Sequence, residues 1–166
     1  FALQDDITVK VITALQVNVT VGDTARHVAK GTENLEAYLK TLEAIESHYT
    51  QTKEGYAQSK RLAEEVIALD PQFPQAYGVM AINHAMEAQQ GFSKSREESL
   101  KQALEWTKKA IAMDDSNATF HATLAWLLSL GRQYDNALAE CERAIELGPN
   151  SALAHIWMAN VLRKVG

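Results

Sequence analysis

Residues 118–151 read ATFHATLAWLLSLGRQYDNALAECERAIELGPNS, a pattern typical of two amphipathic helices joined by a short polar turn. Apolar side chains recur at helical spacing on one face of the first helix, at Leu124, Ala125 and Leu128. One face of the second helix carries an equivalent set, formed by Ala137, Cys141, Ala144, Ile145 and Leu147. Gly148-Pro149 predicts the end of the second helix, because Gly caps helix C-termini and Pro cannot continue a helix.

This stretch is one period of a repeat. It is 34 residues long, and the pattern starts again at Ala152. Its small residues and its proline fall on the diagnostic positions of the tetratricopeptide repeat, at Ala125, Ala137, Ala144 and Pro149. The period of that family is about 34 residues. His121 stands where the family usually has Trp, and Leu128 where it usually has Tyr. The resemblance implies an all-α fold, a right-handed superhelical solenoid of helix-turn-helix repeats.

We expect two parts in the chain, a leader in residues 1–31 and a repeat domain in residues 32–166. The leader is predicted to hold a helix over residues 1–15 and an extended segment over residues 17–21, where apolar and polar residues alternate. The repeats are placed at about 34–70, 74–117 and 118–151, with a half repeat at 152–166. Thr32 is predicted to cap the first helix of the domain.

The leader carries a second resemblance. The strings FALQDDITVKVITALQVNVT and KGTENLEAYLK, in residues 1–20 and 30–40, resemble the linker that precedes the repeats in a bacterial family. Proteins of that family join a class III adenylate or guanylate cyclase domain, or another signalling module, to a TolB-like domain and then to repeats. The resemblance covers only the repeat-bearing half, and it brings no cyclase catalytic residue. It implies that the chain is a piece of a larger signalling protein, which agrees with a sequence that starts at Phe1 and stops within a repeat.

Composition restricts the possible partners. The net charge of −5 over 166 residues argues against nucleic acid as a partner. No apolar run approaches the roughly 20 residues that cross a bilayer, so we expect no direct membrane insertion. The cytoplasm is the default location, although the larger protein could be anchored in a membrane. A single cysteine, Cys141, excludes an internal disulfide and is expected to be a small core residue.

The second repeat is longer than the family period. It spans 44 residues, and the excess falls in QQGFSKSREES, residues 89–99. Ser95-x-x-Glu98 matches a capping box, so the second helix is predicted to start at this point, after a projecting loop over residues 91–94. Phe92 has two interpretations. It is either the anchor of a contact loop or a side chain folded back onto the helix pair. The second interpretation treats the insertion as a tolerated change of length, since surface insertions cost little stability.

The sequence shows no constellation for catalysis, and we expect a non-catalytic chain without a cofactor. It contains no Gly-rich phosphate loop, no nucleophile-elbow motif and no zinc motif. His121 and His155 lie one repeat apart. They could form a metal ladder, but packing between helices explains them better, since no second ligand follows at helical spacing.

The resemblance places the first helix of each repeat along a concave groove. Positions that usually face this groove are Gln75, Gly78, Ile82, Ala85, Met86, Thr119, Ala122, Trp126, Ser129, Leu130, Leu153, Ile156, Asn160, Arg163 and Lys164. The groove is apolar in its middle and basic at Arg163 and Lys164. Trp126 is the strongest predicted anchor for a partner, because aromatic residues dominate binding hot spots. The alternative is that Trp126 packs against a further C-terminal helix.

We expect a scaffold that binds a protein or peptide segment in this groove. The alternative is an oligomerisation module that forms a homodimer through exposed terminal faces, with Met158 and Leu162 at the contact. Relatives that bind chaperone tails use a ladder of polar residues to hold the terminal carboxylate. Ala122 and Ile156 stand at ladder positions here, so an acidic chaperone tail is disfavoured.

Overall fold

A computed structural model describes residues 31–165 of the chain, which form seven helices and contain no strand. The helices are α3 (Leu35–Tyr49), α4 (Lys53–Leu69), α5 (Pro74–Gln90), α6 (Arg96–Met113), α7 (Ala118–Leu130), α8 (Tyr134–Leu147) and α9 (Ala152–Val165). The all-α fold class is therefore confirmed for this part of the chain. The leader helix expected in residues 1–15 and the extended segment expected in residues 17–21 lie outside the described residues.

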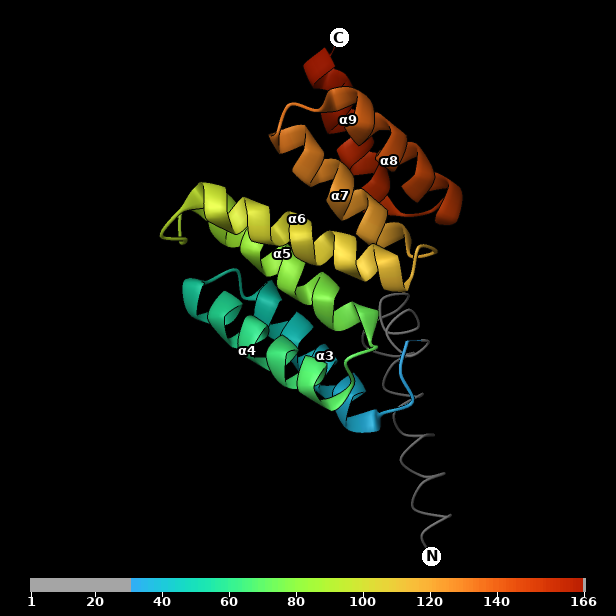
Figure 1. Cartoon of the computed structure of the whole chain (residues 1–166). Coiled ribbons are helices and arrows are strands. Elements are labelled where there is room, and N and C mark those ends of the chain that lie inside the picture. The colour runs from blue at the N-terminus through green and yellow to red at the C-terminus, as the bar shows by residue number, and fades with distance from the viewer. Residues whose placement is uncertain (1–30, 166) are drawn as a thin grey trace, which may run out of the picture.

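The helices stack as antiparallel pairs, with α3 and α4 at one end, α5 and α6 in the middle and α7 to α9 at the other end (Figure 1). The first helices of successive pairs also touch one another, α3 to α5, α5 to α7 and α7 to α9. These four helices form one continuous surface, which we call the inner face. None of the described helices is both long enough and apolar enough to cross a membrane.

Capping residues fix where the helices start. Asn34 caps α3, with its side-chain oxygen accepting a hydrogen bond from the Ala37 N–H at 3.1 Å. The prediction that Thr32 is this cap was wrong, because its hydroxyl is used elsewhere: it donates to Asp70 at 2.5 Å and accepts from the Asn34 N–H at 3.0 Å. Thr32 thus ties the start of α3 to the end of α4.

The second pair is longer than the third by about one turn in each helix. Helices α5 and α6 have 17 and 18 residues, against 13 and 14 in α7 and α8. The predicted loop lies between them: Gly91 ends α5 with a left-handed φ of 75°, and Ser95 caps α6 by accepting from the Glu98 N–H. Most of the excess residues of the second repeat therefore lengthen its helices, and only a small part of them enters the loop.

Small residues let the helices approach closely. Ala125, Ala137, Cys141 and Ala144 are all fully buried between α7, α8 and α9, as the sequence predicted. Gly148 ends α8 with a φ of −142°, so it is not needed for a left-handed turn. A Cβ atom at this position would lie 3.0 Å from the Cβ of Ala118, so the glycine permits a close approach between the end of α8 and the start of α7.

Candidate functional site

The inner face holds most of the residues predicted to line a groove, but only some of them reach solvent. Among the predicted partner-binding residues, the exposed ones are Thr119, Ile156, Arg163 and Lys164. Partly buried ones are Ile82, Met86, Leu130 and Asn160. The fully buried ones are Ala122, Trp126 and Ser129. The middle of the predicted groove is thus largely filled by packing between helices.

Trp126 is not an accessible anchor in this structure. Its side chain is 3% exposed and stacks on Trp157 of α9, with the ring centroids 4.9 Å apart and the planes inclined by 10°. Ile82, Met86 and Leu130 pack around the same cluster. The anchor prediction is corrected for this reason: Trp157 supplies a second large ring that covers the first. Aromatic pairs of this kind contribute about 0.5–1.5 kcal/mol beyond their buried area.

Helix α9 carries the exposed apolar residues of the C-terminal end. Ile156 is 53% exposed and Leu162 is 51% exposed, whereas Met158 is partly buried against α7 and α8. Lys164 lies across the inner face, where its Nζ donates to the Ser129 Oγ at 2.9 Å. Helix α9 therefore combines an exposed apolar surface with a positive charge that is fixed onto α7.

Phe92 folds back onto the first repeat. Its ring is partly buried and lies 6.2 Å from the ring of Tyr56, centroid to centroid. Tyr56 is itself fully buried, and its hydroxyl accepts a hydrogen bond from Gln90 at 2.8 Å. This geometry agrees with the folded-back interpretation of Phe92. The ring holds the loop against α4.

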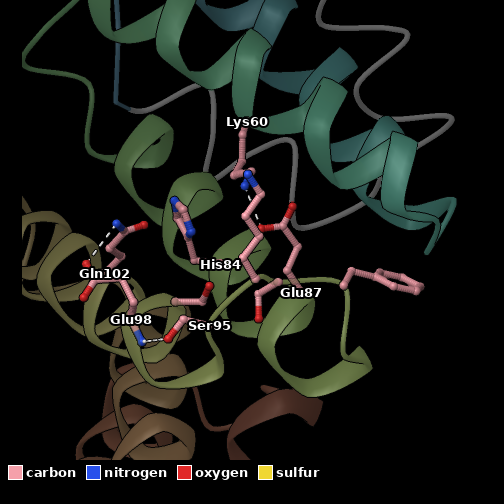
Figure 2. A pocket seen from close by; sticks show the side chains of 10 residues that line it. Lys60, His84, Glu87, Ser95, Glu98 and Gln102 are labelled. Atoms are coloured by element: carbon pink, nitrogen blue, oxygen red, sulfur yellow. Dashed lines mark hydrogen bonds and ion pairs between the residues drawn. The ribbon is translucent and has the colours of Figure 1, made fainter.

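Beside this loop lies a pocket of about 360 Å³ that the sequence did not reveal. Figure 2 shows Lys60 of α4 reaching Glu87 of α5, opposite Glu98 of α6 and Ser95, the residue that caps α6. The full lining consists of Lys60, His84, Glu87, Phe92, Ser93, Lys94, Ser95, Glu98, Ser99 and Gln102. The extra turns of α5 and α6 supply much of this lining, so the pocket is a product of the insertion.

The pocket is polar and contains its own counter-charges. Lys60 Nζ lies 2.6 Å from a Glu87 carboxylate oxygen, and the Glu87 side chain is only 12% exposed. Burial and the nearby Lys60 ammonium lower the pKa of His84, while Glu87 acts in the opposite direction. His84 Nδ1 and Ser93 Oγ are buried without a hydrogen-bond partner among the described residues. Because both atoms are shielded from solvent, they offer no direct contact to an incoming ligand.

A buried hydrogen-bond network joins the first two repeats, and the sequence analysis missed it. Asn83 is fully buried, and its amide nitrogen donates to the Ser59 hydroxyl at 2.7 Å and to a backbone carbonyl of α5. Its amide oxygen therefore faces His48 Nδ1, 3.0 Å away, and that nitrogen must donate. Burial lowers the pKa of His48. The available signal was an asparagine on the otherwise apolar face of helix α5.

The two histidines at equivalent repeat positions have structural partners. The Nε2 atoms of His121 and His155 each donate to the backbone carbonyl six residues upstream, that of Asp115 at 3.0 Å and that of Pro149 at 2.8 Å. His121 Nδ1 also contacts Glu140 at 2.7 Å. In residues 31–165, no group of three or more His, Cys, Asp or Glu residues is placed to hold a metal ion. The two histidines thus fix the turns that precede α7 and α9.

Cys141 lies in the core between α7, α8 and α9. Burial, together with the flanking carboxylates of Glu140 and Glu142, raises the pKa of its thiol to about 11. The thiolate is the nucleophilic form of cysteine, so this side chain acts as a small apolar residue.

Solved structures with the same arrangement of helices decide the fold. The TPR domain of Sgt2 from Aspergillus fumigatus superposes with a TM-score of 0.63 and 16% sequence identity, covering 80% of both chains. The Arabidopsis OM64 TPR domain gives a TM-score of 0.63 at 14% identity, covering 78% of this chain and 96% of that domain. The chain has the tetratricopeptide-repeat fold. The TPR solenoid is right-handed, and its first helices form the inner face described above.

Another TPR structure is that of the first TPR of Spaghetti (RPAP3) bound to an HSP90 peptide. It matches with a TM-score of 0.56 at 15% identity, over 81% of this chain and 97% of that one. No protein-family model matches the sequence.

A curated sequence relative supports the second resemblance. The chain is 30% identical over 137 residues to "Putative adenylate cyclase 3" of Rhizobium meliloti (strain 1021). The match covers 82% of this TPR chain and 23% of that protein. The chain therefore resembles one segment of a much longer relative.

Proposed function

We propose that this TPR chain is a non-catalytic protein-binding scaffold and that it forms part of a larger signalling protein of the adenylate or guanylate cyclase type. The observation that carries the proposal is the match to a segment of an adenylate cyclase relative over most of the chain. The TPR fold supports the binding role, since a solved TPR structure holds a peptide. The cyclase activity would belong to another part of the larger protein.

The surface proposed to contact the partner is the exposed part of the inner face. Ile156, Arg163 and Thr119 are solvent-exposed there, and Ile82 and Met86 are partly exposed. Apolar and basic side chains together suit a protein segment, because interfaces combine an apolar centre with a polar rim. The buried Trp126 has no part in this contact.

Site-specific photo-crosslinking in the source cell tests the proposal. A benzophenone amino acid at Ile156 should form an adduct with a second, different protein. The same group at Lys108, an exposed position on α6, is the matched control and should give no such adduct. Equal adducts at both positions, or none at Ile156, would overturn the binding role.

The alternative function is oligomerisation of the parent protein through the terminal faces. Its specific support is the exposed apolar surface of α9, where Leu162 and Val165 are each about half exposed, at 51% and 49%. In the same experiment this alternative predicts adducts of twice the chain mass. Leu162→Asp would then abolish a concentration-dependent dimer in light scattering, whereas it would leave the mass of a monomeric scaffold unchanged.

A further inference from the structure

We propose that the inner face recognises an extended protein segment of mixed charge, basic at one end, apolar in the middle and acidic at the other end. This inference rests on the proposed binding function and adds the chemistry of the partner. It follows from an unequal distribution of charge along the four helices of the inner face.

The α3 end of the inner face is acidic. Glu36, Glu43 and Glu46 are exposed and recur at helical spacing, so they form one stripe along α3. Lys40 lies on the same helix, but its ammonium is turned toward α4, where it pairs with Glu65 at 2.7 Å. The hydrogen bond to Glu65 and, beyond it, the charges of Glu65, Glu36 and Glu43 raise the pKa of Lys40. Lys40 therefore offsets part of the stripe, whose three carboxylates still leave a net negative charge on α3.

The α9 end of the inner face is basic. Arg163 and Lys164 are exposed in the last turn of α9. The sequence holds neither Asp nor Glu from Leu147 to the C-terminus. Ser129 accepts a hydrogen bond from Lys164 and holds its charge over α7. No acidic side chain on α9 offsets these two cations.

The acidic and basic residues occupy equivalent positions on their helices. Glu46 is the twelfth residue of α3 and Arg163 is the twelfth residue of α9. Equivalent positions on stacked repeat helices point to the same side of a solenoid. Between the two charged ends lie the half-buried Ile82 and Met86 of α5 and Leu130 of α7. Thus the charged ends flank an apolar middle on one surface.

Distance and screening make the two ends act separately. Charges further apart than the Debye length of about 8 Å at physiological salt are largely screened from each other, and two repeats separate α3 from α9. Each end therefore selects its own complementary charge on the partner. Such complementarity governs the orientation and the association rate of a partner more than it governs raw affinity.

Labelled synthetic peptides test this inference on the whole chain by fluorescence anisotropy. The probes share one Leu/Phe centre and differ only at their ends: one carries a lysine block and a glutamate block, one carries lysine at both ends, and one carries glutamate at both ends. The mixed-charge peptide should bind roughly three- to tenfold more tightly than the other two. The difference should shrink in high salt.

Charge reversal assigns each end. The double change Arg163→Glu and Lys164→Glu should shift the preference to the all-lysine peptide. The double change Glu43→Lys and Glu46→Lys should shift it to the all-glutamate peptide. Lys108→Glu on α6 is the control and should leave the ranking unchanged.

Several results would overturn the inference. One is equal affinity for all three peptides, and another is a ranking that survives charge reversal. A third is failure of every peptide to bind while a partner still cross-links at Ile156, which would leave the proposed function standing. A last one is a molecular mass in solution that rises with chain concentration and falls on charge reversal. That result would mean that the two ends recognise a second copy of this chain.

Discussion

Where the first repeat meets the second, α4 and α5 are joined by hydrogen bonds and an ion pair. Asn83, Ser59 and His48 form a buried network, and Lys60 reaches Glu87. Where the third repeat meets the last helix, two tryptophan rings stack between α7 and α9, and Val161 packs on Ala125 and Cys141. The first junction also packs apolar residues, such as Ala44, Leu62 and Val79. The two junctions therefore differ in the polar network that is added at the first one.

The difference has consequences for stability. An apolar junction depends on filled volume, so it is sensitive to the loss of atoms and insensitive to pH. A polar junction depends on partners for every buried group, so it is sensitive to protonation and to the loss of one partner. We therefore expect the two ends of this solenoid to fail under different conditions.

The largest effect is expected at the aromatic junction. Trp126→Ala removes a ring that is 3% exposed and should lower the free energy of unfolding by about 3–5 kcal/mol. Urea unfolding followed by circular dichroism measures this loss. Trp126→Phe keeps a ring and should cost clearly less. A Trp126→Ala chain as stable as the parent would mean that the ring stack does not support α9.

The next effect is expected in the buried network. Asn83→Ala removes the amide that bridges His48 and Ser59 and should cost about 2 kcal/mol, because buried polar groups lose their partner. Asn136, which is exposed on α8, provides the control: Asn136→Ala should leave the urea midpoint nearly unchanged. If both variants lose equal stability, the buried network around Asn83 contributes no more to stability than an exposed asparagine does.

A smaller effect is expected from the ion pair beside the pocket. Lys60→Met leaves the Glu87 carboxylate, with a side chain 12% exposed, without its cation and should cost about 1 kcal/mol. Lys40→Met is the matched control, because its partner Glu65 is 45% exposed and is stabilised by water instead. Thermal melting of the two variants in parallel provides the measurement. Equal shifts would show that burial of Glu87 does not matter.

The smallest effect is expected from pH. Burial lowers the folded-state pKa of His48 and of His84 below the ordinary value of about 6.5. Below that value the unfolded chain binds more protons than the folded chain, so stability falls as the pH decreases from about 6.5 toward the folded pKa. Urea midpoints at pH 7.5 and pH 5.5 should show this loss, and His48→Gln should reduce it. A loss that is unchanged in both His48→Gln and His84→Gln would assign the pH dependence to other groups.

Periodicity predicted the helices well, because a buried face repeats at every turn of a helix. Ala125, Ala137 and Ala144 were identified as close-packing residues in this way, and the Ser95 cap followed from its spacing to Glu98. The prediction of Thr32 as the first cap failed, because Asn34 is the cap. Both residues are good caps, and the partner that removes Thr32 is Asp70, which lies 38 residues away.

The site was harder to predict, because periodicity shows which face of a helix a residue lies on but not which residue of another helix it contacts. Trp126 lies on the predicted inner face, yet the ring that covers it is Trp157, 31 residues later. Lys60 and Glu87 come from different repeats and show no local pattern. Such contacts depend on how one helix pair sits on the next, which a single sequence does not specify.

The longer helices of the second repeat restrict how this chain can change in length during evolution. Helices α5 and α6 are each four residues longer than their counterparts α7 and α8. Four residues turn a helix by only about 40° beyond a full rotation and add about 6 Å to its length. An antiparallel pair can accept this step when both members take it together, since each new turn then lies beside the new turn of its neighbour. A deletion confined to one of the two helices would leave the facing turn of the other helix without a neighbour. We therefore expect that, among relatives, a change in the length of one helix is accompanied by an equal change in the other.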